Sequence, residues 1–294
     1  MKLSIITINL NNREGLKKTV ESVVSQTLTD FEYIIIDGGS TDGSVELIKQ
    51  YTNRITFWIS EPDKGIYNAM NKAIVMANGE YCQFLNSGDY LYDKTVLEKV
   101  FSQGCNEDII VGNYIEFSSA NRWRLQKGRI WFCSQEGRQM SVFDLFLSKI
   151  SHQASFIRRS LFDKYGLYDE NCKITADWLF YFRTIGLGDV SHKHIDLPVV
   201  FFDMNGMSNS MPSGTAWNER MDAYHKLLPA NILKDYLHFM NMEFEFHYVK
   251  KYRITRLIVH FLNILVSKYD SAMIRFCMFC EKHNIKTKHR ERFY

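Results

Sequence analysis

Hydrophobic and polar residues alternate in blocks over about the first ninety residues of the chain. Short apolar runs rich in valine and isoleucine, which are typical of buried strands, alternate with segments whose apolar residues recur at three- and four-residue spacing, which is typical of helices. The predicted strands are 3–8, 31–36, 55–59 and 81–85, and the predicted helices are 16–26, 45–51 and 66–77. This alternation predicts a parallel α/β sheet with helices on both of its faces.

Residues 60–89 show the pattern most clearly, as a polar loop, a helix, a turn, a buried strand and an acidic loop. The helix is followed by Gly79, and a glycine at the end of a helix is typical of a residue with positive φ. We therefore expect Gly79 to end the helix in that conformation. The strand 81–85 then ends abruptly in the sequence Asn86-Ser87-Gly88-Asp89.

Three of the predicted strands end in polar loops, at residues 9–12, 37–42 and 86–89. Because the carboxyl ends of parallel strands share one edge of a sheet, we expect the three loops to meet there and to form a site for a metal-bound or hydroxylated ligand. Asp37 is placed to accept hydrogen bonds from a base or a ribose, or alternatively is a turn residue before glycine. Asp89 could instead only cap the segment that follows it.

Composition and charge limit the possible classes of function. The 294 residues are 46% hydrophobic and 23% charged, as in a globular protein, and the net charge of +3 gives no support for binding of nucleic acid. The first loop lacks a Gly-x-Gly-x-x-Gly run, so a Rossmann dinucleotide site is not predicted. The absence of a Gly-Lys-Ser/Thr run equally removes a P-loop.

The sequence also bears on location. It enters a strand at once without the pattern of a signal peptide, and no apolar run approaches the ~20 residues that a membrane span needs. We expect a soluble cytoplasmic protein that at most lies on the inner face of the plasma membrane. Among six scattered cysteines only Cys277 and Cys280 are close together, and without a second ligand pair we interpret them as reduced thiols.

Five motifs, in order and at family-like spacing, resemble family 2 glycosyltransferases of the GT-A fold. They are residues 4–11 (SIITINLN), 21–27 (ESVVSQT), 36–43 (IDGGSTDG), 60–71 (SEPDKGIYNAMN) and 79–89 (GEYCQFLNSGD), and a weaker match covers 151–183. The combination is specific, although no single motif would be. The chain looks most like the branch found in bacterial capsule, O-antigen and exopolysaccharide gene clusters.

The resemblance implies how the donor is held. In this family the first loop and the aspartate after the second strand hold the nucleotide of a nucleoside-diphosphate sugar, and for this chain we expect a UDP-sugar. The residues that match these positions are Thr7, Asn9, Asn11 and Asp37.

The family's acidic loop is usually Asp-x-Asp-Asp and binds a divalent cation between the diphosphate oxygens. The matching residues here are Asn86, Ser87 and Asp89, so the resemblance implies donor contacts for all three and makes Asp89 the carboxylate ligand of Mg²⁺ or Mn²⁺. An asparagine carbonyl can bind a hard cation but brings no charge. Lys64 could offset this by approaching a phosphate as a point charge, or alternatively is a solvated loop lysine.

The resemblance places the catalytic base at Asp177, in a helix that faces the acceptor. Inverting transfer needs one carboxylate that takes the proton of the acceptor hydroxyl while its oxygen attacks the anomeric carbon. The departing diphosphate needs a metal or cations rather than an acid. By position alone, Asp177 could also be a first-turn aspartate stabilised by the helix dipole. His152 is predicted to contact a phosphate or an acceptor hydroxyl, with a structural hydrogen bond as the alternative.

The predicted organisation is a GT-A catalytic domain over residues 1–214 and a helical C-terminal extension over 215–294. The catalytic domain would have a nucleotide-sugar half, about 1–115, and an acceptor half, about 116–214. Long helical patterns and a basic tail mark the extension. Its helices could lie on an anionic membrane where lipid-linked acceptors reside, or could pack on the catalytic domain or on a second subunit of a homodimer.

We predict an inverting glycosyltransferase that moves a sugar from a nucleoside-diphosphate sugar, UDP-sugar first, to a saccharide or lipid-linked saccharide in bacterial surface polysaccharide synthesis. Two other classes stay open. A nucleotidyltransferase would need basic residues in a Gly-rich first loop, which this chain lacks. A nucleotide-sugar-binding protein without transfer activity would fit the reduced acidic loop.

Overall fold

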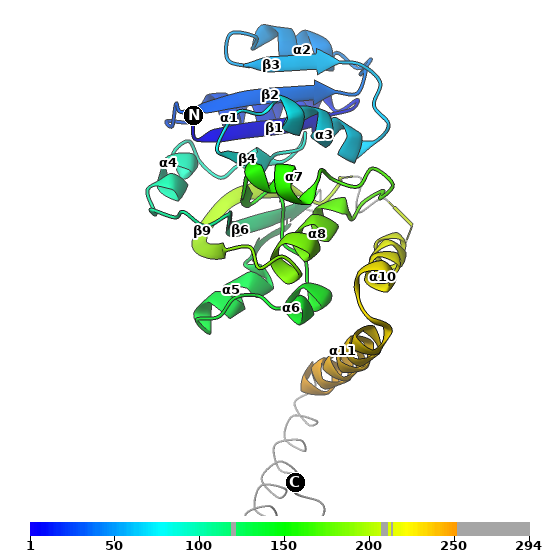
Figure 1. The fold of residues 1–294 in the computed structure, drawn as a ribbon. Helices are drawn as coiled ribbons and strands as arrows, with labels where there is room; N and C mark the ends of the chain where they lie inside the picture. The colour runs from blue at the N-terminus through cyan, green and yellow to red at the C-terminus, as the bar shows by residue number, and fades with distance from the viewer. Residues whose placement is uncertain (119–121, 207–210, 213, 252–294) are drawn as a thin grey trace, which may run out of the picture. The chain divides into compact units, whose positions relative to one another are not determined.

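The computed structural model describes residues 1–118, 122–206, 211–212 and 214–251 (Figure 1). The chain divides into two compact units, Met1–Pro229 and Ala230–Tyr294. The second unit is described only through helix α11 (Ala230–Lys251). The helices predicted beyond Lys251, the pair Cys277 and Cys280, and the basic tail lie outside the described residues.

Within the described residues, the first unit is built on one nine-stranded sheet. Its strands are β1 (Leu3–Asn9), β2 (Phe31–Asp37), β3 (Phe57–Ser60), β4 (Tyr81–Phe84), β5 (Tyr90–Leu91), β6 (Ile109–Ser118), β7 (Arg122–Gln126), β8 (Ser155–Arg158) and β9 (His192–Asp203). The spatial order is β3-β2-β1-β4-β8-β6-β9-β5, and β7 pairs with β6. The first four strands are parallel, whereas β8 runs antiparallel between β4 and β6, so the sheet is mixed.

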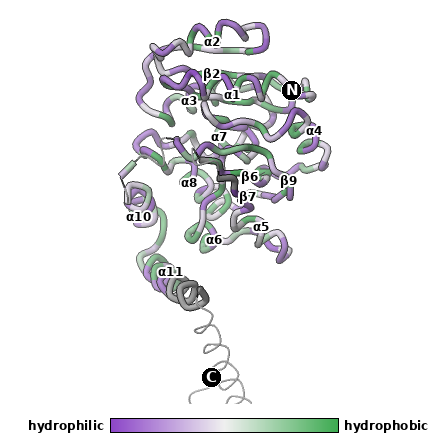
Figure 2. Tube along the Cα trace, turned by 180° about the vertical axis from the view of Figure 1, so that it is seen from behind, coloured by the Kyte–Doolittle hydropathy of each residue, from purple (hydrophilic) through white to green (hydrophobic). Residues whose placement is uncertain are grey.

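Helices cover both faces of this sheet, because the residues of the central strands β1, β2 and β4 are buried almost without interruption. The helices are α1 (Arg13–Val24), α2 (Ser44–Gln50), α3 (Ile66–Met76), α4 (Val96–Phe101), α5 (Gly128–Gln135), α6 (Val142–Leu147), α7 (Ser160–Tyr165), α8 (Ala176–Tyr181), the π-helical turn η1 (Phe182–Gly186) and α10 (Thr215–Leu227). Ile5 and Ile35 pack with Val20 of α1 in one core. On the other face, Phe84 contacts Phe162 of α7, with 6.1 Å between ring centroids. Figure 2 shows hydrophobic stretches along the central strands and hydrophilic residues in many of the connecting loops.

The early elements agree with the sequence pattern, with small shifts at their ends. The four predicted strands correspond to β1 to β4, and the three predicted helices correspond to α1 to α3. The short elements α5, α6 and β8 were not predicted. Each has only four to eight residues, which is too short for a periodic pattern to distinguish a strand from a helix.

The prediction for Gly79 is wrong. Gly79 is not among the residues with positive φ, and α3 ends at Met76 and is followed by Ala77, whose backbone is extended (φ −70°, ψ 136°). A Cβ atom at position 79 would lie 2.5 Å from the backbone nitrogen of Ser4 and 2.6 Å from the carbonyl carbon of Leu3. Glycine is required here because the chain passes directly against β1, where no side chain fits.

Helix α10 packs within the first unit. The ring of Tyr224 stacks on Phe146 at 4.3 Å between centroids and meets Trp178 edge-on at 5.1 Å. The contacts of the chain therefore divide after Pro229, later than the change of composition near Thr215.

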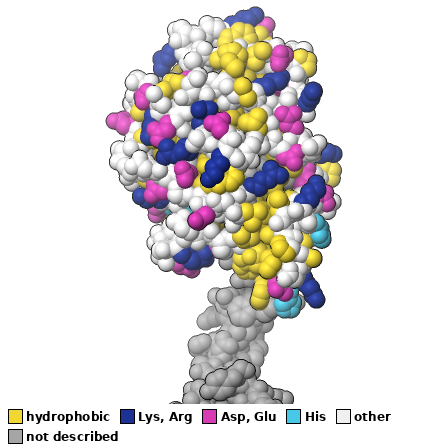
Figure 3. All heavy atoms as spheres, viewed as in Figure 1, with side chains coloured by type: hydrophobic (Ala, Val, Ile, Leu, Met, Phe, Trp, Pro, Cys, Tyr) yellow, Lys and Arg dark blue, Asp and Glu magenta, His cyan; other side chains and the backbone are white. Residues whose placement is uncertain are grey.

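The surface in Figure 3 mixes lysine and arginine with aspartate and glutamate. This face therefore presents no single-signed field of the kind that attracts nucleic acid. Among the residues that the structure describes, no helix has the length and apolar character required to cross a bilayer.

Candidate active site

The carboxyl ends of β1, β2 and β3 lie in register at one edge of the sheet. Asn9 is the register partner of Asp37, and Asp37 is the partner of Ser60. Strand β4 runs parallel beside β1, so the loop 86–89 reaches the same edge. The structure thus brings the three predicted polar loops together, because all three follow parallel neighbouring strands.

Asp37 is the centre of a closed hydrogen-bond network at this edge. Its buried carboxylate accepts bonds from the Ser40 backbone N–H (2.9 Å) and hydroxyl (2.6 Å), from the Ser60 hydroxyl (2.6 Å) and from Asn9 Nδ2 (2.7 Å). Burial alone would raise the pKa of Asp37, but these four bonds outweigh it and hold the pKa below its ordinary value. A carboxylate has about four lone-pair sites, so this one is fully used.

Asn11 and Thr7 occupy different environments. Asn11 is exposed with a positive φ of 48°, and its backbone N–H donates to the Ser40 hydroxyl at 2.8 Å. Thr7 is fully buried, and its hydroxyl donates to the Leu85 carbonyl at 2.8 Å and lies 3.0 Å from the Tyr33 hydroxyl. Asn11 therefore lies at the rim of the edge, whereas Thr7 braces the interior of the sheet.

Asp89 lies in an environment unlike that of Asp37. It is 4% exposed, and the hydrogen bond that its Oδ1 accepts from the Asp203 backbone N–H is 2.8 Å long. Burial raises the pKa of Asp89 to about 7, since the bonds from Asp203 and Gln153 and the nearby His152 offset it only in part. The Asp203 carboxylate adds a like charge that also raises the pKa. Asp203 reaches this edge because β9 runs parallel to β6.

Asn86 completes the acidic loop with an unsatisfied oxygen. Its Nδ2 lies 3.4 Å from His152 Nε2, and its Oδ1 is buried without a hydrogen-bond partner in the described part of the chain. Buried polar atoms normally have partners, so a bare carbonyl oxygen in the same loop as a carboxylate of raised pKa fits a hard divalent cation. No three histidine, cysteine, aspartate or glutamate side chains cluster as ligands within the described residues. Most ligands of such a cation would therefore come from substrate or water.

The remaining predicted donor residues lie beside these loops. The backbone carbonyl of Ser87 accepts a bond from Asn12 Nδ2 at 3.0 Å, which ties the acidic loop to the first loop. Lys64 is exposed just before α3, and its ammonium group forms no ion pair with another described residue. It is free to meet a ligand.

Asp177 is held in the first turn of α8 by side chains from two other elements. Its Oδ2 lies 2.8 Å from His152 Nδ1, and its Oδ1 accepts a bond from the Tyr67 hydroxyl at 3.1 Å. Burial would raise the pKa of Asp177, but these bonds and one from the Trp178 backbone N–H outweigh it and hold the pKa below its ordinary value. The side chain keeps 18% of its surface exposed, so a ligand can reach it.

A small cavity of about 160 Å³ opens beside Asp177. Its walls combine aromatic, cationic and hydrogen-bonding side chains, including Tyr114, Lys149, His152, Asp177, Phe202 and Arg220. None of the strand-end residues Asn9, Asn11 and Asp37 lines it. The cavity is therefore separate from the Asp37 network.

Sequence reasoning missed four residues of this site: Tyr67, Asp203, Glu219 and Arg220. Tyr67 lies inside the motif 60–71, so a signal was present for it, whereas Asp203 is the last residue of β9, which lies beyond the four predicted strands. Glu219 and Arg220 lie in α10, a helix assigned by composition to the extension, and nothing local marks them.

Glu219 connects α10 to the segment that carries Asp177. Its carboxylate accepts bonds from the Lys173 backbone N–H (2.7 Å), the Ile174 backbone N–H (3.3 Å) and the Thr175 hydroxyl (2.7 Å). Because Thr175 precedes α8 directly, these bonds fix the start of that helix and hence the position of Asp177.

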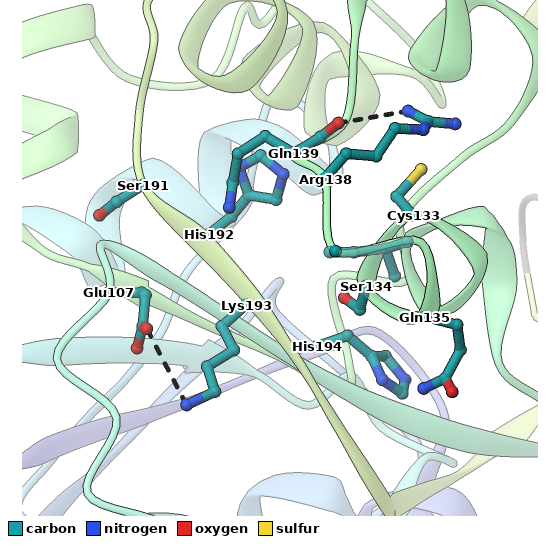
Figure 4. Close-up of a pocket in the computed structure, with 12 residues that line it drawn as sticks. Glu107, Cys133, Ser134, Gln135, Arg138, Gln139, Ser191, His192, Lys193 and His194 are labelled. Carbon is teal, nitrogen blue, oxygen red and sulfur yellow. Dashed lines mark hydrogen bonds and ion pairs between the residues drawn. The ribbon is translucent and has the colours of Figure 1, made fainter.

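A larger cavity of about 570 Å³ lies at the opposite edge of the sheet, by the amino ends of β6 and β9 (Figure 4). Its most polar groups are already paired. Arg138 makes two bonds to Asp144, of 2.6 and 3.1 Å, and His192 Nε2 accepts from the Met140 backbone N–H at 2.9 Å. This cavity therefore differs from the site around Asp177 in two ways: it lies at the opposite edge of the sheet, and its polar groups already have partners.

The fold is that of GT-A glycosyltransferases. S. aureus TarS, solved as residues 1–349 in complex with UDP, matches with a TM-score of 0.56 and 18% identity, over 69% of this chain and 60% of that one. The mannosyltransferase PcManGT from Pyrobaculum calidifontis, in complex with GDP-Man and Mn²⁺, matches with a TM-score of 0.52 and 13% identity, over 68% and 56%. The chain thus spans less than two thirds of either structure.

The family follows from the sequence. Residues 4–166 match the model of glycosyl transferase family 2. The chain is also 29% identical over 219 residues to the PGL/p-HBAD biosynthesis glycosyltransferase of Mycobacterium tuberculosis, covering 71% of this chain and 79% of that relative. The chain belongs to glycosyl transferase family 2, and the resemblance drawn from its motifs is confirmed.

Proposed function

We propose that this glycosyltransferase moves a sugar, with inversion, from a nucleoside-diphosphate sugar to a hydroxyl of a saccharide or lipid-linked saccharide. The product would be part of a bacterial surface polysaccharide. One observation carries the proposal: Asp177 lines a small cavity, and its carboxylate is held by Tyr67 and by His152, whose other ring nitrogen lies near Asn86 of the acidic loop.

The donor would lie across the carboxyl ends of β1, β2 and β4. Asn9 Oδ1 is buried without a hydrogen-bond partner in the described residues, so it is a free acceptor for a base or ribose. The saturated carboxylate of Asp37 would shape the loop, and a donor group would reach it only by replacing a bond such as that from Ser60. The UDP bound to TarS supports a UDP-sugar as the first donor to test.

We further propose Mg²⁺ or Mn²⁺ as the cofactor, held by the carboxylates of Asp89 and Asp203 and the Asn86 carbonyl. The raised pKa of Asp89 and the unpaired Asn86 Oδ1 support this assignment, as does the Mn²⁺ in the mannosyltransferase structure. When bound, such a cation supplies positive charge where the diphosphate leaves. Lys64 would add a second positive charge from the start of α3.

Asp177 would act as the general base. Its carboxylate takes the proton of the acceptor hydroxyl while that oxygen bonds to the anomeric carbon and the bond to the diphosphate oxygen breaks. The lowered pKa keeps Asp177 ionised at neutral pH, so His152 Nδ1 carries the hydrogen that lies between the two side chains. With Tyr67, His152 thereby orients the carboxylate, and its other ring nitrogen faces Asn86 in the acidic loop.

The test is Asp177→Asn in the full chain. We expect transfer to fall by roughly 10²- to 10⁴-fold, the usual contribution of a general base. Binding of UDP, followed by calorimetry, should stay unchanged because Asp177 does not line the donor edge. Asp163→Asn in α7 is the matched control, since this exposed aspartate also lies near the start of a short helix. Transfer that survives Asp177→Asn would remove Asp177 as the base.

Inversion is tested separately by the configuration of the product. Nuclear magnetic resonance of the new glycosidic linkage should show the anomeric configuration opposite to that of the donor. Retention of the donor's configuration would contradict a single displacement at the anomeric carbon.

A further inference from the structure

Arg220 of α10 is a half-buried cation that forms no salt bridge within the described residues, although the charge of the Asp177 carboxylate, which lines the same cavity, acts on it. Its guanidinium lies 4.8 Å from the centre of the Trp178 ring, its Nε is buried without a hydrogen-bond partner, and it has no ion pair among the described residues. Burial lowers the pKa of Arg220, although an arginine stays charged at neutral pH. Asp177 offsets part of this charge, but the buried Nε still lacks a hydrogen-bond acceptor, and a buried donor without a partner points to a ligand.

The surrounding contacts hold Arg220 in place. Its neighbour Glu219 accepts three hydrogen bonds from the segment before α8. One turn further along α10, Tyr224 packs on Phe146 and Trp178. The guanidinium is therefore positioned before any ligand arrives, which reduces the entropy lost on binding.

The cavity that Arg220 lines defines what a ligand must offer. Lys149 is a second, exposed cation at the cavity, and Asp177 is its only carboxylate among the described residues. Tyr114 and Phe202 present aromatic rings, 6.1 Å apart between centroids. A fitting ligand has an apolar ring face, a hydroxyl group within reach of Asp177 and an anionic group.

We propose that Arg220, assisted by Lys149, binds a phosphate or carboxylate carried by the acceptor. The acceptor is then an anionic saccharide or a sugar linked to a lipid diphosphate, rather than a neutral sugar. The planar guanidinium fork binds both anions through paired hydrogen bonds. This inference rests on the proposed function, in which Asp177 activates an acceptor hydroxyl in this cavity.

The first test uses the unmodified full chain saturated with UDP, so that donor phosphate contacts are already occupied. Three sugars of similar size are titrated by nuclear magnetic resonance: glucose 1-phosphate, methyl glucuronide and methyl glucoside. We expect an anionic sugar to bind about tenfold more tightly than methyl glucoside, as one charge-assisted hydrogen bond would provide. Preference for glucose 1-phosphate indicates a phosphate group, and preference for the glucuronide indicates a carboxylate. Equal affinity for all three sugars would overturn the proposal.

The second test changes the cation. Arg220→Gln should remove the preference for anionic sugars, Arg220→Lys should retain part of it, and both should leave UDP affinity unchanged. Lys226→Gln, which removes an exposed charge from the same helix, is the control and should change nothing. If Arg220→Gln weakens UDP binding and spares the anionic preference, Arg220 belongs to the donor site and the proposal is wrong.

The two proposals fail in different ways. A native chain that does not bind UDP contradicts the proposed function, whereas the same sugar titration without UDP still measures the anionic preference. A chain that binds UDP normally but does not distinguish the three sugars contradicts only the role of Arg220.

Discussion

Asp37 and Asp89 are both buried aspartates that follow parallel strands at the same edge of the sheet, yet the pKa values of their carboxylates are shifted in opposite directions. Asp37 accepts four hydrogen bonds, and its pKa lies below the ordinary value. Asp89 is surrounded by fewer donors and by a second carboxylate, and burial raises its pKa to about 7. The two aspartates thus lie at the same edge, and the stronger desolvation of Asp89, its fewer donors and the like charge of Asp203 together make the difference in pKa.

The comparison distinguishes a carboxylate whose hydrogen bonds are satisfied without ligand from a loop whose polar groups are not satisfied. The Asp37 carboxylate is saturated without ligand, and only the neighbouring Asn9 Oδ1 lacks a partner in the described residues. The acidic loop combines a carboxylate of raised pKa with the unpaired Asn86 Oδ1, so it gains most from an added cation. A buried polar group that lacks partners is therefore the better guide to where a ligand binds.

The largest expected effect is on the pH dependence of stability. Because the folded pKa of Asp89 is raised, its contribution to stability is complete below its unfolded pKa near 4 and is lost as pH rises through about 7. The loss is on the order of 4 kcal/mol. Urea unfolding of the native chain and of Asp89→Asn between pH 4.5 and 8 should show it as a falling difference between the two proteins.

The contribution of Asp37 to stability depends on pH in the opposite direction, because its pKa is lowered. This contribution is present above the unfolded pKa and is lost as pH falls through the folded pKa.

The control for the Asp89 series is Asp222→Asn, which changes an exposed residue of α10. Mn²⁺ with UDP should cancel the loss at high pH because it favours the ionised carboxylate. A native chain and Asp89→Asn with parallel pH profiles would contradict the raised pKa.

The next largest effect should come from Asp37→Asn, measured by urea unfolding at pH 7. The amide keeps the shape of the side chain but presents an N–H group to donors, so we expect a loss of about 3 kcal/mol. Asp89→Asn should not destabilise the metal-free chain at that pH, because it removes a carboxylate that is costly to bury. Similar losses for both variants would erase the distinction between the two regions.

Ser60→Ala should have the smallest effect. It removes one of the four donors to Asp37, which costs about 1–2 kcal/mol and raises the pKa of Asp37 toward its ordinary value. Thermal unfolding at pH 7 measures the loss of stability, and its change between pH 7 and pH 4 reports the shift in the pKa of Asp37. Ser87→Ala in the acidic loop is the matched control, because no described hydrogen bond runs from its hydroxyl to a carboxylate. An equal loss for the two serines would show that the Asp37 network is not the source of stability.

Much of the fold was predictable because local pattern and parallel pairing agree. Valine- and isoleucine-rich runs predicted β1 to β4, and the carboxyl-end rule then brought Asn9, Asp37 and Asp89 to one edge. The strand β8 was not predictable in the same way. It has four residues, and its antiparallel insertion between β4 and β6 depends on pairing with distant strands.

The same distinction holds for the candidate site: single residues were predictable, but the contacts between them were not. Asp177 and His152 were each predicted, but their contact joins residues 25 positions apart, and the bond from Tyr67 spans 110. Gly79 is the clearest example of what the sequence could not predict. The pattern identified this residue, but glycine is needed there because the chain passes against the backbone of β1, which is distant in the sequence.

The order of the strands and helices in the first ninety residues, the polar loops at the strand ends and the membership in family 2 can all be obtained from the sequence alone, because they depend on periodicity and short motifs. Which carboxylate is saturated, and the fact that α10 brings Glu219 and Arg220 to the segment and cavity of Asp177, became known only from the folded chain. Donor counts, burial and charge pairing are properties of residues that meet in space, and they therefore exist only once the chain is folded.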